Sequence, residues 1–251
     1  MAGHSKWSKV KRIKGAIDVK RGKLFSKLSK EITVAARMGG GDPSGNPRLR
    51  SAVLAARAQS MPNDNIDRAI KRGTGDGDDA AHYEELVYEG YAPGGVAVIV
   101  EVATDNRNRT AADLRLIFTK YHGNLASTGS VSYMFKRKGQ ISVPREAVGE
   151  DQLLDIILEA GADELNEDGE QYVITTAPDH LYEAAEALRN AHIPSKSHQL
   201  TYLPDIEVPI HDEMVAGQVL KLCDALEDND DVQNVYANFD LPEELLSKLS
   251  A

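Results

Sequence analysis

The sequence has 251 residues and a formal net charge of −10, but its charges are distributed very unevenly. Residues 1–72 contain seventeen Lys and Arg against five Asp and Glu, a net charge of +12, so residues 73–251 carry a net charge of −22. A positive end of this strength is typical of contact with a polyanion, first nucleic acid and only second a membrane surface. The hydrophobic fraction of 41% is ordinary for a soluble globular protein.

The composition excludes several other classes of protein. The single cysteine, Cys223, can form neither an internal disulfide nor a zinc site by itself, which indicates a reducing compartment. No apolar run approaches the ~20 residues that cross a bilayer, and no apolar block of a secretory signal follows the basic N-terminus. Residues 1–17 lack acids, as mitochondrial presequences do, but they also lack the apolar face and Arg-rich character of such segments. We therefore expect a cytoplasmic protein that does not contact membranes.

Residues 1–78 are predicted to form a basic helical domain with a loose N-terminal arm. Residues 23–38 have a helical period that places apolar side chains on one face and cations on the other, and Gly39, Gly40 and Gly41 end this helix. The apolar positions are Leu24, Phe25, Leu28, Ile32, Ala35 and Ala36, and the cationic positions are Lys23, Lys27, Lys30 and Arg37.

Two shorter helices are predicted later in the same domain. Asn46 and Pro47 are the residue types preferred at a helix N-cap and in its first turn, so a helix should begin there. A third helix should run from residue 63 or 64 to Gly73, which we expect to be the glycine that follows its C-terminus. Residues 73–81 (GTGDGDDAA) have the composition of a linker.

The rest of the chain is predicted to form two α+β domains. Residues 137–205 follow a β-α-β-α-β order close to the ferredoxin-like pattern and could fold alone. The segment before them has strands but only one helix to cover these strands, and the missing cover appears only near the C-terminus. We therefore predict that the third domain, residues 137–205, is inserted into the second, residues 79–136 and 206–245. The predicted strands are residues 85–91, 96–104, 131–135, 140–143, 171–176, 198–203 and 232–239; the predicted helices are residues 110–121, 151–160, 178–191 and 214–226; and residues 136–139 are predicted to be a turn.

The basic N-terminal domain is the strongest functional signal. Charge runs are usually solvated helix surfaces, but acids that could pair with these cations along a helix are scarce here. The excess positive charge therefore repels itself unless a polyanion neutralises it. The tryptophan among the cations could stack on an unpaired base or serve as a packing anchor. The predicted nucleic-acid-binding residues are Lys6, Trp7, Lys9, Lys11, Arg12, Lys14, Lys20, Arg21, Lys23, Lys27, Lys30, Arg37, Arg48 and Arg50.

A second candidate site lies at residues 104–110 (TDNRNRT). Polar residues between a strand and a helix bring backbone N–H groups near Arg107 and Arg109, an arrangement that can hold an anion. The alternative, which is favoured, is that Asp105, Asn106 or Asn108 caps the helix and the arginines pair with nearby acids.

The sequence contains no recognisable catalytic constellation. The seven histidines form no metal-ligand pair, the glycine-rich residues 39–43 lack the phosphate-binding lysine pattern, and no nucleophile elbow is present. The acidic runs at residues 76–79 and 228–231 lack the pattern of a calcium loop. We therefore expect a protein that is not an enzyme and that uses no metal or other cofactor.

Several long segments closely resemble the YebC/PmpR family. They are GHSKW (3–7), LFSKLSKEITVAAR-GG (24–40), DPSGNPRLRSAV (42–53), MPNDNIDRAIKRGTG (61–75), YEGYAPGGVAV (88–98), TDNRNRTAADLR (104–115) and GSVSYMF (129–135). The likeness spans nearly the entire chain. One departure is HGNLA at residues 122–126, where the family pattern leads us to expect a more glycine-rich run.

The resemblance implies a helical N-terminal domain and two α+β domains, the last inserted in the second. It also implies two functions that do not fully agree. Many members are described as cytoplasmic DNA-binding transcriptional regulators, whereas others are translation factors: a mitochondrial relative activates translation of a cytochrome oxidase subunit, and bacterial relatives relieve ribosome stalling on proline-rich stretches. We therefore expect a monomeric, non-enzymatic regulator that binds DNA, with a factor that binds ribosomal RNA or the ribosome as the alternative.

Overall fold

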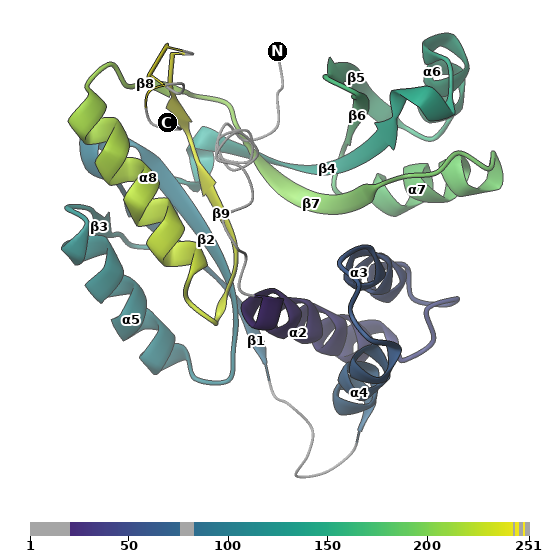
Figure 1. The fold of residues 1–251 in the computed structure, drawn as a ribbon, viewed down its shortest axis with the longest axis horizontal. Coiled ribbons are helices and arrows are strands. Elements are labelled where there is room, and N and C mark those ends of the chain that lie inside the picture. Colours follow the sequence, from purple (N-terminus) through teal and green to yellow (C-terminus); the bar gives the residue numbers. More distant parts are fainter. Residues whose placement is uncertain (1–20, 76–82, 243, 246–247, 249–251) are drawn as a thin grey trace.

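The computed structural model describes residues 21–75, 83–242, 244–245 and 248. Figure 1 shows a group of helices and two sheet-containing units, with the N-terminal helices beside both units. The fold class predicted from the sequence is thus confirmed: a helical N-terminal region is followed by α+β domains. The predicted basic arm and its tryptophan, residues 6–20, lie outside the described part of the chain.

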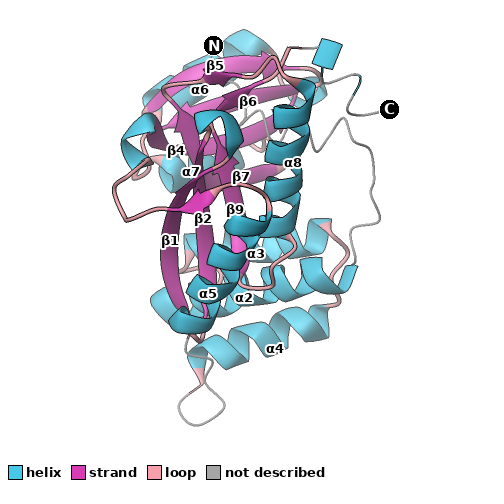
Figure 2. Cartoon of the chain, turned by 90° about the vertical axis from the view of Figure 1, so that its left-hand side faces the viewer, coloured by secondary structure: helices cyan, strands magenta, loops and turns pink. Residues whose placement is uncertain are grey.

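The N-terminal helices form a three-helix bundle with its own core. They are α2 (Arg21–Gly39), α3 (Pro47–Ala58) and α4 (Asn63–Thr74), and Figure 2 shows α2 and α4 side by side below the sheets. Asn46 caps α3 as predicted, because its side-chain oxygen accepts a hydrogen bond from the N–H of Leu49 at 3.1 Å. The core of this bundle consists of Ile32, Ala35, Ala36, Leu49, Ala52, Val53, Ala56, Met61, Ile66 and Ala69.

Gly73 has a different role from the one predicted. It lies inside α4 and is buried, whereas Gly75 follows the helix. A Cβ atom at Gly73 would lie 2.3 Å from the carbonyl oxygen of Thr33 and 2.9 Å from the Cβ of Ala36. The glycine is therefore required by close helix packing, which brings the C-terminal end of α4 against the C-terminal half of α2.

The second domain is a four-stranded antiparallel sheet covered on one face by two helices. Its strand order is β3-β1-β2-β9, in which the C-terminal strand β9 pairs with β2. The strands are β1 (Glu84–Tyr91), β2 (Ala97–Thr104), β3 (Asn124–Leu125) and β9 (Val232–Ala237), and the helices are α5 (Arg107–Lys120) and α8 (Glu213–Glu227). The short strands β8 (Val208–Pro209) and β10 (Phe239–Asp240) pair in parallel beside it.

The packing of α8 bears on the predicted domain insertion. Val219 and Leu222 of α8 share one buried cluster with Val98 and Val100 of β2, and with Leu114 of α5. The chain therefore returns to the sheet of β2 after the third domain. This packing supports the proposed division into residues 1–78, 79–136 with 206–245, and 137–205.

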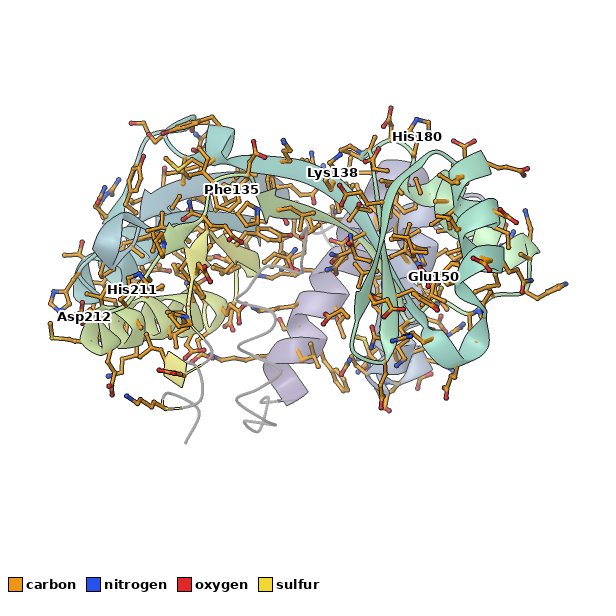
Figure 3. The ribbon with its side chains drawn as sticks, turned by 90° about the horizontal axis from the view of Figure 1, so that it is seen from above. Phe135, Lys138, Glu150, His180, His211 and Asp212 are labelled. Carbon is orange, nitrogen blue, oxygen red and sulfur yellow. The ribbon has the colours of Figure 1, made fainter. Side chains whose placement is uncertain are left out.

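The connection between the second and third domains is one long strand. We predicted a strand at residues 131–135 and a turn at 136–139, and both predictions are wrong. Residues Ser132–Met134 form a 3-10 helix, and β4 (Phe135–Pro144) runs without a break through residues 136–139. Figure 3 shows Phe135 and Lys138 along this strand between the two domains. Gly139 suggested a turn, but it is a strand residue that lies against Thr176, whose Oγ1 would be 2.3 Å from an added Cβ.

The third domain has the ferredoxin-like arrangement, including a strand that the sequence did not indicate. The order of its antiparallel sheet is β5-β6-β4-β7. Strand β5, whose sequence ADELNED is polar, is an edge strand with no fully buried residue, so it lacks the apolar alternation that identifies strands. The other elements are α6 (Glu150–Glu159), β5 (Ala162–Asp168), β6 (Gln171–Thr176), α7 (Leu181–Asn190) and β7 (Ser197–Pro204). Two further 3-10 turns are Pro93–Gly95 and Arg145–Ala147.

A buried carboxylate fixes the loop that leads from the second domain into β4. Glu89 of β1 is 3% exposed and accepts hydrogen bonds from the N–H groups of Gly129, Val131 and Ser132 at 2.7, 2.6 and 2.9 Å. Burial alone would raise the pKa of Glu89, but these backbone hydrogen bonds outweigh it and lower the pKa.

Candidate nucleic-acid interface

The predicted cationic face of α2 is turned toward the second domain. Lys23 donates to the carbonyl oxygen of Asp228 at 2.7 Å, and Lys27 donates to that of Glu227 at 2.6 Å. Lys30 donates to the carbonyl oxygen of Asp230 and to the carboxylate of Asp231, each at 2.8 Å. We call Lys23, Lys27 and Lys30 the lysine row, and residues 227–231, from the last residue of α8 to the start of β9, the 227–231 turn. Figure 1 shows this turn beside α2.

Asp231 is the centre of a polar network at this contact. Its second carboxylate oxygen accepts hydrogen bonds from Thr110 Oγ1 at 2.7 Å and from Arg109 at 2.9 Å. Burial alone would raise the pKa of Asp231, but the hydrogen bonds from Lys30, Arg109 and Thr110 lower it to about 2. The carboxylate therefore stays ionised and joins α2 to the second domain.

These contacts correct the expectation that the cations of α2 form an open, uncompensated stripe. The Lys30 side chain is only 11% exposed, and that of Lys23 is 36% exposed. The sequence could not indicate this, because the oxygen atoms that hold the lysine row come from residues about 200 positions later, and most of them belong to the backbone.

Arg48 and Arg50 of α3 also contact other domains. Arg48 pairs with Glu31 of α2 at 2.8 Å and with Glu85 of β1 at 2.5 Å. Burial would lower the pKa of Arg48, but its hydrogen bonds to the two carboxylates outweigh that effect and raise it. Arg50 pairs with Glu186 of α7 at 3.2 Å, at the place where α3 packs beside β7.

The structure favours the capping alternative at residues 104–110. Asn106 is the N-cap of α5, and its side-chain oxygen accepts a hydrogen bond from the N–H of Arg109 at 3.1 Å. The Arg109 guanidinium pairs with Asp105 at 2.8 Å and with Asp231 at 2.9 Å, so carboxylates already occupy the place of an anion. Arg107 is exposed, and its carbonyl oxygen accepts a hydrogen bond from the Tyr88 hydroxyl.

Other cations of the bundle do face solvent. Arg57 at the end of α3 and Lys71 and Arg72 at the end of α4 are exposed, and within the described ranges none of them has an ion-pair partner. Arg37 at the end of α2 is exposed as well. Arg68 is exposed and is bonded only locally, to the carbonyl oxygen of Asp64 and the side chain of Asn65.

Arg57, Arg68, Lys71 and Arg72 are not among the predicted nucleic-acid-binding residues, although the sequence contains a signal for them. Positions 68, 71 and 72 have the i, i+3, i+4 spacing of one helix face. Cations at a helix C-terminus are also favoured by the helix dipole, which explains their presence there without a ligand. The close approach at Gly73 brings this end of α4 to the half of α2 that carries Arg37.

Among the described residues, a buried apolar cluster spans the second and third domains, whereas none spans the bundle and either of them. Phe135, Tyr236 and Ile99 form a buried cluster against which Tyr202 of β7 packs. Among the residues that the structure describes, the bundle's apolar cluster contains only its own side chains. Ion pairs and hydrogen bonds are therefore a large part of the contact between the bundle and the other domains.

The described residues give no support to a catalytic or metal site. Within those ranges no three His, Cys, Asp or Glu side chains are grouped so that they could hold a metal ion. The cavity of about 690 Å³ between the end of α5 and the start of α8 is wide open and is lined by residues such as Lys120, His122 and Lys221. As far as the chain is described, no helix has the length and apolar character needed to cross a membrane.

Comparisons with known proteins assign the family. Residues 5–76 match the "TACO1/YebC protein N-terminal domain", and residues 83–239 match the "TACO1/YebC second and third domain". A protein of Rubrobacter xylanophilus is 55% identical over 250 residues with 100% of both chains covered, and one of Chlorobaculum tepidum is 55% identical over 251 residues with 99% of each covered. Both are named probable transcriptional regulatory proteins.

A solved structure shares the fold. The crystal structure of a conserved hypothetical protein from Aquifex aeolicus has a TM-score of 0.80 and 50% sequence identity, covering 90% of this chain and 92% of that chain. The two domain matches together with these relatives show that the chain belongs to the TACO1/YebC family.

Proposed function

We propose that the protein is a non-enzymatic, cytoplasmic regulator of gene expression that binds DNA through its N-terminal domain. The observation that carries this proposal is the net charge of +12 in residues 1–72, part of which remains as solvent-facing cations at the ends of α2, α3 and α4. The relatives that are named probable transcriptional regulatory proteins support the same class of function.

The proposed contact is with phosphates rather than with bases. In the described structure it consists of Arg37, Arg57, Arg68, Lys71 and Arg72, and the sequence adds the cations of residues 6–20. Phosphate contacts position a protein on a duplex but carry no sequence information directly. We therefore propose modest sequence specificity, and the net charge of −22 in the rest of the chain keeps the other domains away from the duplex.

Charge reversal tests this proposal. Arg57→Glu, Lys71→Glu and Arg72→Glu together should weaken binding to a labelled duplex by at least about tenfold, because three phosphate contacts become repulsive. The matched control is Arg115→Glu, Lys120→Glu and Lys221→Glu, which changes the net charge equally at exposed positions of the second domain. Equal affinities for the two triple variants would refute an interface on the bundle.

A ribosome- or RNA-binding translation factor is the second candidate. The observation that favours it is that the cations of residues 6–20 are mostly lysine, which meets the phosphate of DNA or RNA as a point charge. Ultraviolet cross-linking in cells, followed by sequencing of both DNA and RNA, separates the two candidates. Recovery of promoter DNA supports the first function, and recovery of ribosomal RNA supports the second.

A further inference from the structure

The contact between the lysine row and the 227–231 turn is the basis of a further inference, which rests on the proposed function. We propose that the turn occupies a phosphate-binding site of the bundle, so that nucleic acid and the second domain compete for the same three lysines. In this structure the turn covers the lysine row. Binding of nucleic acid to the row then requires the bundle to separate from the second domain.

The spacing of the lysine row suits a nucleic-acid strand. Lys23, Lys27 and Lys30 lie on one face of α2, and with a rise of 1.5 Å per residue they extend over about 10 Å. A strand of duplex DNA carries one phosphate per ~3.4 Å of helix axis, so a row of this length can face more than one phosphate. Lysine suits such a contact because its ammonium group is a compact charge with three donors.

The 227–231 turn presents a row of oxygen atoms that resembles a run of phosphates. The carbonyl oxygens of residues 227, 228 and 230 accept from Lys27, Lys23 and Lys30, respectively, at 2.6 to 2.8 Å. The carboxylates of Asp228 and Asp231 add formal charge. These atoms lie at or just after the C-terminal end of α8, where the helix dipole is negative. The turn therefore offers the lysines a negative surface in place of a polyanion.

The contact is of a kind that can open. The bundle shares no apolar cluster with the second domain within the described residues, whereas the second and third domains share one. Polar interfaces between domains permit relative motion, and the Lys23–Asp228 ion pair of this contact is exposed enough for salt to weaken it. A polyanion that binds the lysine row more strongly than the turn does would therefore shift the bundle to the open arrangement.

Two sets of substitutions should have opposite effects on the affinity for a labelled duplex. Asp228→Lys with Asp230→Lys makes the turn repel the lysine row, so affinity should rise by about tenfold. Lys23→Glu, Lys27→Glu and Lys30→Glu together open the same contact but remove the site, so affinity should fall.

The control for added positive charge is Asp151→Lys with Asp155→Lys on the exposed face of α6. If this control raises affinity as much as the turn variant does, the competition is overturned.

A reversible lock tests the opening directly. Lys23→Cys and Asp228→Cys place thiols on the two sides of the contact, while the native Cys223 is buried. Joining the two thiols with a short, reducible cross-linker should hold the turn on the lysine row. The row then no longer contributes to duplex binding, so the affinity for the duplex should fall. Reduction of the cross-linker should restore the affinity of the unlinked protein. Equal affinity of the linked and unlinked protein overturns the inference. Absence of nucleic-acid binding by the wild type and by every variant refutes the proposed function instead.

Discussion

Lys30 of α2 and Asp231 of the second domain form an ion pair of 2.8 Å whose side chains are 11% and 8% exposed. The pair is the most buried of the described contacts between the bundle and another domain. Lys30 is one of the predicted nucleic-acid-binding residues. Asp231 was notable in the sequence only as part of the acidic run at residues 228–231. The N-terminal cations therefore have two roles: some dock the bundle to the second domain, and others form the proposed contact with phosphate.

Asp231 makes stability depend on pH in the acid range. Its pKa is lowered from 3.8 to about 2 in the folded protein, so its stabilising contribution is present above pH ~4 and is lost as the pH falls through about 2. The shift corresponds to about 2 kcal/mol of unfolding free energy. In Asp231→Asn, urea unfolding at pH 2 to 4 should therefore show a shallower dependence on pH. Asp155→Asn on α6 is the control and should keep the wild-type dependence.

Glu89→Gln should loosen the loop before β4. The amide can accept with only one oxygen, and its NH₂ group would face N–H donors that now bind the carboxylate at 2.6 to 2.9 Å. We expect the unfolding free energy to fall by about 1–3 kcal/mol, since a buried polar group loses its partner. Chemical denaturation measures this change. Glu146→Gln, at an exposed position of the third domain, should change stability little. An unchanged midpoint in Glu89→Gln would show that the three hydrogen bonds do not hold the loop.

Gly73→Ala should destabilise the bundle even though alanine favours helices. The added methyl group would lie 2.3 Å from the carbonyl oxygen of Thr33, so α4 must move away from α2. We expect a loss of about 2 kcal/mol, in the range of other overpacked helix contacts. Gly217→Ala in α8 is the matched control, because nothing lies within 4 Å of its added Cβ. That change should instead stabilise the protein by up to ~1 kcal/mol, through helix propensity alone.

His122→Gly should stabilise the second domain. His122 has a φ of 62°, a left-handed conformation that disfavours side chains with a Cβ, and it is exposed. The relief of this strain exceeds the entropy that a glycine adds to the unfolded chain, so we expect a gain of about 0.5 kcal/mol. Thermal unfolding measures it. His180→Gly, where φ is −87°, should bring no gain. The departure from the family's glycine-rich pattern at residues 122–126 thus falls on a position where glycine is favoured.

The helices were predictable because each had a local signal. The apolar period of α2 and the Asn46 cap of α3 depend on neighbouring residues only, and both are seen. The errors at β4 and β5 occurred where strand pairing overrides local composition. Residues 136–139 are basic and end in glycine, but they pair with β7 over residues 200–203. Edge strand β5 is polar because one side of its ladder faces solvent and none of its residues is fully buried.

The sequence predicts only the domain in which the candidate site lies. The charge count placed it in the first domain, and solvent-facing cations are present there. Which cations face solvent depends on how distant segments pack. Lys27 is held by a backbone carbonyl of residue 227, a partner that no pattern of charged residues reveals.

The most direct test of the central claim is the salt dependence of the affinity for a DNA duplex. If the N-terminal domain neutralises about six phosphates, the logarithm of the binding constant should fall with the logarithm of salt concentration with a slope of about −5. The triple variant Arg57→Glu, Lys71→Glu and Arg72→Glu should reduce the steepness of this slope by about 3. A wild-type slope near zero, or a slope that the triple variant leaves unchanged, would contradict binding of the phosphate backbone by this domain.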